Sequence, residues 1–244
     1  MIDEEPRALK AAYDYVKTLI GEDITRIKGV KCDPQRAALI LKAYARNIST
    51  AAKLSTIKSD VEANDDTIDP RTLDSYITAF ERLFVIKDIV AWSPNIRSKS
   101  TIRTSNIRQL VDPSIATAIL GIAPSDLVSD LKTFGLLFES MAMRDLRVYA
   151  ESLDAQIYQY HDSDGLEADA IIHFMTGGKW AAIEIKIGGD KLIEEGAANL
   201  LALKKKVNTE KMREPEFLMI VTATQHAYRR PDGVLVVPIG CLKC

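Results

Sequence analysis

Two charged residues interrupt an apolar segment of strand length at residues 179–189, KWAAIEIKIGG. Side chains alternate between the two faces of a β-strand, so Glu184 and Lys186 share one face with Trp180 and Ala182. A charge on a covered sheet face is costly unless it has a partner. The segment therefore favours a fold in which neighbouring strands or helices supply partners for both charges.

The elements predicted around this strand describe a mixed sheet covered by helices. We expect helices over roughly 126–150 and 191–207, and strands near 156–161, 167–175, 180–187, 217–223 and 234–239. The turns HDSDG and TGGK suit hairpins between the first three strands. The helix that follows suits a crossover to a further strand. The order predicts an α+β or α/β domain over residues 123–244 with an αβββαβ core.

The first half of the chain has the periodicity of helices, which we expect near 6–20, 34–48, 51–62 and 70–84. Asp69 and Pro70 form a start signal for the last of these. Its apolar stripe is expected to contain Leu73, Ile77, Phe80 and Phe84. Strand-like segments at 84–92 and 106–112 then flank a basic stretch. This is the order of a winged helix-turn-helix domain, expected over 34–122 after a helical lead-in over 1–33.

Such a domain would place its third helix in the DNA major groove and its ribbon on phosphates. The residues expected to contact nucleic acid are Arg71, Thr72, Ser75, Arg82, Arg97, Lys99, Arg103 and Arg108. One alternative is a small helical domain with a solvated basic loop. Another is a winged helix that serves protein interaction or dimerisation. A homo-oligomer is left open.

The composition describes an ordinary globular chain rather than a membrane or wholly basic protein. The formal net charge is −2, and 47% of the residues are hydrophobic. No apolar run approaches the roughly 20 residues of a membrane helix, and the acidic N-terminus lacks the apolar core of a signal peptide. Three cysteines make no disulfide framework. We expect a cytoplasmic protein that does not enter a membrane.

Further carboxylates are expected beside Glu184 and Lys186. Asp169 lies in the preceding predicted strand and, if the two strands pair, faces the same way. Glu139 interrupts an apolar helical stripe that would pack on the sheet. Two carboxylates with one lysine leave excess negative charge, which suits Mg²⁺ or Mn²⁺ with oxygen ligands. The alternative is an exposed sheet face with a cross-strand salt bridge worth under about 1 kcal/mol.

The arrangement of Glu139, Asp169 and Glu184-x-Lys186 is similar to that of the PD-(D/E)XK nuclease-like fold. The phrases GLLFESMAMRDLRVYA, YHDSDGLEADAII and AAIEIKIGG further resemble the C-terminal half of a prokaryotic family of AAA-type P-loop ATPases. In that family, a winged helix and a nuclease-like domain of unknown function follow the ATPase domain. The resemblance implies catalytic roles for Glu139, Asp169, Glu184 and Lys186, and a metal held by Asp169, Glu184 and the carbonyl of Ile185.

Two departures qualify the resemblance. Ala168 stands where the family name has proline, and the chain contains no G-x-x-x-x-G-K-[ST] motif. We therefore expect no ATP hydrolysis by this chain, and an ATPase domain that is separate or missing. The expected function is metal-dependent hydrolysis of DNA phosphodiesters. One alternative is a non-catalytic DNA-binding, docking or regulatory module with a vestigial carboxylate site. Another is a transcription regulator that acts through the winged helix alone.

Overall fold

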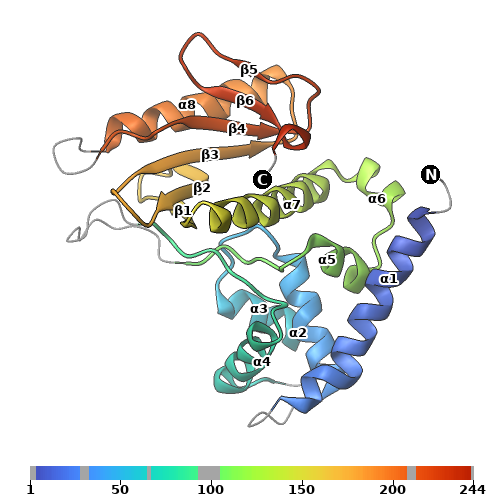
Figure 1. Ribbon diagram of the computed structural model, residues 1–244. Helices are drawn as coiled ribbons and strands as arrows, with labels where there is room; N and C mark the ends of the chain where they lie inside the picture. The colour runs from blue at the N-terminus through green and yellow to red at the C-terminus, as the bar shows by residue number, and fades with distance from the viewer. Residues whose placement is uncertain (1–3, 28–32, 65–66, 93–104, 208–212, 243–244) are drawn as a thin grey trace. The chain divides into compact units, whose positions relative to one another are not determined.

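A computed structural model describes residues 4–27, 33–64, 67–92, 105–207 and 213–242 (Figure 1). Its contacts divide the chain into two compact units. The first contains Met1–Asp88 and Ile107–Ser140, and the second contains Ile89–Asn106 and Met141–Cys244. The second unit is thus built from two separate stretches of chain, whereas the sequence predicted one continuous domain from residue 123.

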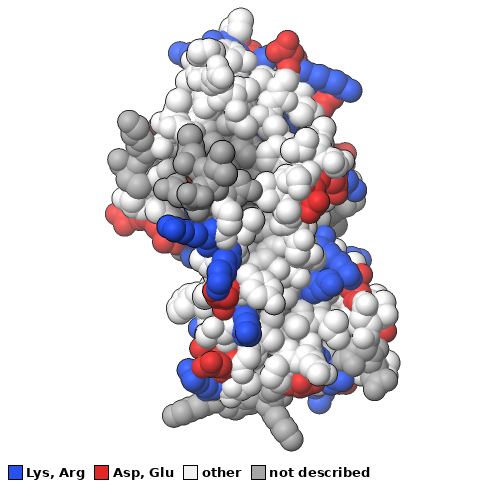
Figure 2. Space-filling model, turned by 90° about the vertical axis from the view of Figure 1, so that its right-hand side faces the viewer, with Lys and Arg blue, Asp and Glu red and all other residues white. Residues whose placement is uncertain are grey.

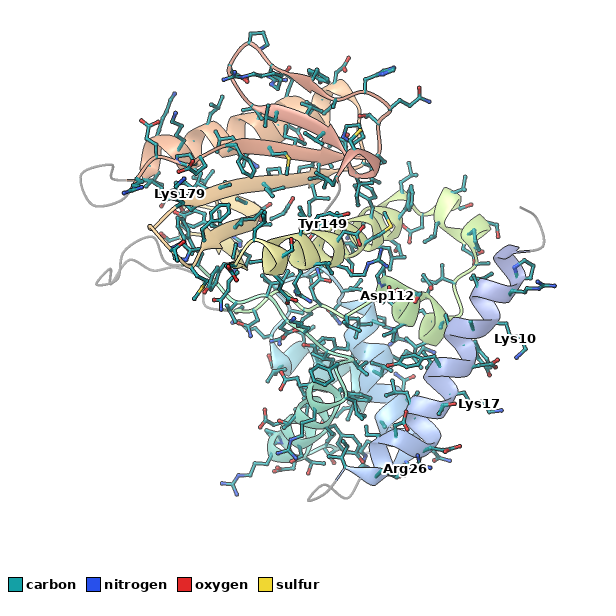
Figure 3. All side chains as sticks on the ribbon, viewed as in Figure 1. Lys10, Lys17, Arg26, Asp112, Tyr149 and Lys179 are labelled. Carbon is teal, nitrogen blue, oxygen red and sulfur yellow. The ribbon has the colours of Figure 1, made fainter. Side chains whose placement is uncertain are left out.

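The first unit is helical. It contains α1 (Glu4–Thr18), α2 (Pro34–Arg46), α3 (Leu54–Glu62), α4 (Pro70–Arg82), α5 (Pro113–Leu120), α6 (Pro124–Ser129) and the first part of α7 (Leu131–Ser152). A π-helical turn, Leu19–Asp23, and a 3₁₀ turn, Ile24–Arg26, extend α1. Figure 3 shows Lys10 and Lys17 along α1. The core is apolar and includes Leu19, Ile24, Ile40, Leu41, Tyr44, Ile57, Ile77 and Phe80.

Three helices of this unit begin with the same local device. Asp33, Asp69 and Asp112 each accept a hydrogen bond from the backbone N–H two residues later, and a proline follows each cap. Figure 3 marks Asp112 at the start of α5. The proline has no N–H to leave unsatisfied in the first turn, so the pair fixes where the helix begins. The start predicted at Asp69 and Pro70 is confirmed.

The predicted apolar stripe of α4 is wrong at its last residue. Leu73, Ile77 and Phe80 are buried, but Phe84 is 77% exposed. The helix ends at Arg82, and Phe84 has a left-handed φ of 55°. The amide of Val85 then donates to the carbonyl of Phe80 at 2.9 Å. This turn closes the helix and rotates Phe84 off the buried face.

In the described residues, the predicted ribbon is short and irregular: Ile86 forms an antiparallel bridge with Leu110, Lys87 N–H donates to the carbonyl of Gln109 at 3.0 Å, and Val111 N–H donates to the carbonyl of Val85 at 2.9 Å. The neighbouring residue Arg108 pairs instead with the loop after α2: its N–H donates to the carbonyl of Thr50, and its carbonyl accepts from the N–H of Ser49, both at 2.8 Å. The tip of the predicted wing, residues 93–104, lies outside the described residues.

The second unit contains a mixed sheet, as predicted. Its strands are β1 (Ala155–His161), β2 (Glu167–Phe174), β3 (Trp180–Lys186), β4 (Leu218–Thr222), β5 (Tyr228–Arg229) and β6 (Leu235–Pro238). Their order is β1-β2-β3-β4-β6-β5. β1, β2 and β3 form an antiparallel meander, β3, β4 and β6 are parallel, and β5 adds antiparallel to β6. The two-residue β5 was not predicted.

Helix α8 (Asp190–Lys206) joins β3 to β4 and covers one face of the sheet (Figure 1). Its buried residues Ile193, Ala197 and Leu200 share a core with Trp180 and Ala182 of β3. This is the face that also carries Glu184 and Lys186. The charged pair therefore lies under a helix rather than on an open sheet. A 3₁₀ turn, Ile239–Cys241, follows β6.

The helix predicted over 126–150 is two helices. The chain breaks at Asp130, whose φ of −126° and ψ of 80° lie outside the helical region. The carboxylate of Asp130 accepts hydrogen bonds from the N–H of Thr133 at 3.1 Å and from its hydroxyl at 2.6 Å. This capping interaction starts α7. Within the described residues, neither α7 nor any other helix combines the length and apolarity needed to span a membrane.

Candidate carboxylate–lysine site

The pairing of β2 with β3 brings the predicted carboxylates together. Ala170 pairs with Ile183, and continuing this register by one residue places Asp169 opposite Glu184. The ammonium Nζ of Lys186 lies 2.6 Å from Glu184 Oε2 and 3.5 Å from Asp169 Oδ2. Three of the four predicted catalytic residues therefore form one cluster on two neighbouring strands.

Asp169 is fixed by the backbone of β3. Its Oδ2 accepts a hydrogen bond from the N–H of Ile185 at 2.7 Å. The carboxylate therefore points across the strand pair toward Lys186 rather than away from the sheet. Ile185 itself directs its side chain to the opposite, buried face, so its contribution to this cluster is through its backbone.

Glu184 is fully buried, which makes its charge expensive. Burial and the nearby carboxylate of Asp169 raise the pKa of Glu184 to about 8, although Lys186 and Asn199 act in the opposite direction. Oε2 forms the ion pair with Lys186, and beyond that contact it has no hydrogen-bond partner among the described residues. Burial and Asp169 thus favour the protonated form of Glu184, whereas the ion pair with Lys186 favours the ionised form.

The chemistry of these donors fits a hard divalent cation, because the side chains of Asp169 and Glu184 and the carbonyl of Ile185 offer oxygen atoms. Two conditions attach to this fit. Lys186 now occupies the space between the carboxylates, and Glu184 would have to release its proton. No group of three or more His, Cys, Asp or Glu residues suited to a metal occurs in the described parts of the chain.

Access to the cluster from solvent is one-sided. The side chains of Lys186 and Asp169 are 23% and 16% exposed, whereas that of Glu184 is not exposed at all. A bound molecule would therefore meet Lys186 and Asp169 first. Glu139 lies on α7 in the first unit, where it is half-buried. Its participation in the site remains a prediction.

The residues predicted to bind nucleic acid on α4 form part of one helix face. Arg71, Ser75 and Arg82 are exposed, and their spacing of four and seven residues aligns them along the helix. Thr72 is half-buried beside them. The exposed Asp74 and Glu81 flank the row, so its charges balance. Figure 2 likewise shows basic and acidic side chains interspersed over one side of the molecule.

The prediction that Arg108 contributes to a basic surface is wrong, because this residue is only 8% exposed. Its guanidinium forms an ion pair with Asp88, and its Nε donates to the carbonyl of Ala52 at 2.8 Å. The hydroxyl of Tyr44 donates a hydrogen bond to the same Asp88. Burial, and to a lesser extent the negative charge of Asp88, raises the pKa of that hydroxyl. Arg108 thus stabilises the interior of the first unit. Arg97, Lys99 and Arg103 lie outside the described residues.

Comparison with known families places the chain among domains whose function is not known. A family model described as a domain of unknown function, DUF8612, matches residues 2–126, about half of the sequence. The chain belongs to this family. A second model, also for a domain of unknown function, DUF4143, matches residues 134–242. No curated protein matches the sequence. The first match ends inside α6 and the second begins inside α7, so the boundary between them lies within residues 127–133, a few residues beyond the predicted break at residue 123.

Sequence reasoning missed the residues of α8 that surround Glu184. Asn199 donates from Nδ2 to Glu184 Oε1 at 3.4 Å. Gly196, one turn earlier, lies against the side chain of Glu184. A glycine in the middle of an otherwise apolar helix face was the available signal, since it destabilises a helix unless something packs closely against it.

Proposed function

We propose that this chain is a DNA-binding, divalent-metal-dependent nuclease-like protein that hydrolyses DNA phosphodiesters. The proposal combines the PD-(D/E)XK resemblance of the second unit with the winged-helix resemblance of the first. One observation carries it: Asp169, Glu184 and Lys186 converge on two paired strands, with Lys186 Nζ within 3.5 Å of Asp169 Oδ2 and 2.6 Å of Glu184 Oε2.

Each residue of the cluster has a distinct part in this proposal. Asp169 and Glu184 would hold Mg²⁺ or Mn²⁺ together with the carbonyl of Ile185. When bound, such a cation lowers the pKa of water and offsets charge on a phosphate. Lys186, the most exposed of the three, would move from the carboxylates to the scissile phosphate and stabilise its added negative charge.

The DNA would be held by the first unit. Arg71 and Arg82 lie on the exposed face of α4, with the hydroxyl of Ser75 between them. Two arginines can neutralise phosphates, although the neighbouring Asp74 and Glu81 weaken the local positive potential. Arg97, Lys99 and Arg103 would supply further phosphate contacts.

A second candidate is a non-catalytic docking or regulatory module. The position of Lys186 favours it: its ammonium lies within ion-pair distance of both Asp169 and Glu184, so it already offsets much of the negative charge that would attract a cation. Domains of the DUF4143 type are typically associated with AAA ATPases. The partner in that case would be an ATPase domain, and the carboxylates would stabilise the sheet.

Titration calorimetry with Mg²⁺ and Mn²⁺, alongside a plasmid-nicking assay, separates these candidates. Asp169→Asn is the test variant, because asparagine can still accept the hydrogen bond from Ile185 N–H. Asp154→Asn is the matched control: it is exposed and has a left-handed φ of 51°, which asparagine tolerates well.

Nuclease function predicts metal binding and nicking in the wild type and in Asp154→Asn, with both lost in Asp169→Asn. Metal binding without nicking would indicate an intact site that lacks its proper DNA or partner. If the wild type binds neither cation, the nuclease proposal fails and the docking module takes its place.

A further inference from the structure

The two oxygens of Glu184 have different neighbours. Oε2 lies 2.6 Å from Lys186 Nζ, on the side of the cluster that Asp169 also faces. Oε1 accepts from Asn199 Nδ2 at 3.4 Å. Asn199 is half-buried on α8. The orientation of the Glu184 carboxyl is thus set by a strand residue on one side and a helix residue on the other.

The close approach of α8 to β3 brings Asn199 within reach. Gly196 lies three residues before Asn199, which places both on one helix face. A Cβ atom at position 196 would stand 3.4 Å from Glu184 Cβ and 3.5 Å from Ile220 Cδ1. A side chain larger than alanine would therefore separate the helix from the strand and carry Asn199 away from Oε1.

We propose that Asn199 is a positioning residue for Glu184. By donating to Oε1 it turns Oε2 toward Asp169, where both carboxyls would hold the divalent cation. This inference rests on the proposed metal-dependent function. An amide suits the role because it donates a hydrogen bond without adding charge: a lysine would neutralise Glu184, and an aspartate would repel it. Groups that orient metal ligands in this way strongly influence affinity for the metal.

The test is calorimetric titration of Mn²⁺ into the full chain and three variants. Asn199→Leu keeps the branched shape but removes the donor, whereas Asn199→Gln keeps a donating amide. Lys205→Leu is the matched control, because Lys205 is exposed on the same helix. Asn199→Leu should weaken Mn²⁺ binding by roughly 10- to 100-fold. Asn199→Gln should restore most of the affinity, and Lys205→Leu should bind as the wild type does.

Thermal melting of the same proteins without metal separates positioning from general stability. Asn199→Leu should melt close to the wild type, because leucine can pack in the half-buried position. An unchanged Kd for Mn²⁺ in Asn199→Leu overturns the role of Asn199 but leaves the nuclease proposal standing. Absence of Mn²⁺ binding by the wild type overturns both.

Discussion

Glu184 combines a fully buried carboxyl with a nearby carboxylate and one lysine. Its pKa, raised to about 8, means that the folded protein prefers the neutral side chain. The ionisation of Glu184 therefore contributes to how the cluster responds to pH and to the negative charge that it can offer a cation. The raised pKa follows from the burial of Glu184 under α8.

The first prediction concerns the pH dependence of stability. The pKa of Glu184 lies above its usual 4.5, so between these values the folded protein holds a proton that the unfolded chain has lost. The contribution of Glu184 to stability is complete below the usual pKa and is lost as pH rises through about 8. The slope is at most about 1.4 kcal/mol per pH unit.

Glu184→Gln should remove this slope, because glutamine resembles the protonated acid at every pH. Urea unfolding across the range from about pH 5 to pH 9 measures it. We expect the free energy of unfolding of the variant to rise relative to that of the wild type as pH increases, so that the variant is the more stable protein at the alkaline end of this range. Parallel curves for the two proteins would contradict a raised pKa.

At the scale of elements, α8 connects the middle of the sheet to the turn between β1 and β2. α8 contacts β3 and β4 at Gly196 and meets the hairpin turn at its C-terminal end. There, Lys206 Nζ lies 2.7 Å from Asp162 and 2.5 Å from Asp164. One helix thus positions Glu184 at its middle and ties down a turn at its end.

Gly196→Ala should stabilise the protein. The added Cβ meets Glu184 and Ile220 at ordinary contact distances, and alanine is a better helix former than glycine by roughly 0.5–1 kcal/mol. Ala198→Gly, on the exposed side of the same helix, is the reverse control and should lower the free energy of unfolding by a similar amount. Chemical denaturation checks both. Destabilisation by Gly196→Ala would mean that helix and strand cannot accommodate even one methyl group.

Asp162→Asn should destabilise the hairpin. The buried carboxylate accepts from Tyr160 OH at 3.0 Å, Asp164 N–H at 2.9 Å and Leu166 N–H at 3.1 Å, besides Lys206. Burial acts to raise the pKa of Asp162, but these bonds lower it to about 2. Its stabilising effect is therefore present above the usual 3.8 and is lost as pH falls toward 2.

We expect a loss of about 1–3 kcal/mol for Asp162→Asn near neutral pH, measured by urea unfolding. Asp164→Asn, in the same turn but largely exposed, is the matched control and should change the free energy of unfolding little. Equal losses in the two variants would show that burial of Asp162 is not the source of the effect.

At the scale of the whole molecule, the chain leaves the first unit, contributes to the second and returns. Residues 90–92 lie along the edge of β1: Trp92 N–H donates to the carbonyl of Gln159 at 2.7 Å, and Gln159 N–H donates to the carbonyl of Val90 at 3.0 Å. The Trp92 ring packs 4.9 Å from Trp180 and 6.3 Å from Tyr160, centroid to centroid. This segment belongs to the core of the second unit.

Trp92→Ala should therefore lower the free energy of unfolding of the second unit by about 3–5 kcal/mol, because the substitution opens a large cavity in that core. Trp180 remains as the single tryptophan and reports unfolding by its fluorescence. Val90→Ala, two residues earlier and exposed, is the control and should change stability little. A small effect of Trp92→Ala would mean that residues 90–92 only lie against the sheet.

The sequence allowed some of this architecture to be predicted, for reasons visible in particular residues. Asp69 with Pro70 marks a helix start by local chemistry alone. The alternation in β2 and β3 was enough to bring Asp169, Glu184 and Lys186 together, because a hairpin fixes its own register. The destination of Arg108 could not be foreseen. An arginine in a basic stretch looks like a surface residue, and its partner Asp88 lies outside that stretch.

The contacts of Asn199 and Trp92 were equally hidden, because each depends on tertiary packing between distant segments. Asn199 lies in an ordinary helical pattern until α8 is placed on β3. Trp92 ends a strand-like run that was expected to pair with residues 106–112. Ile86 of that run does pair with Leu110, but Trp92 pairs with β1 instead. Local patterns specify that a segment is extended; they do not specify its neighbour.

The edge position of residues 90–92 has a consequence for how the protein is made. Trp92 is synthesised well before β1 and Trp180, against which it packs in the folded protein. At about 5–20 residues per second, the chain up to Trp180 follows only after roughly 4–18 s. During that interval an apolar segment waits without its partner, while the helices on its N-terminal side can already begin to pack. Residues 90–92 therefore stay without their native neighbours for the whole of that interval.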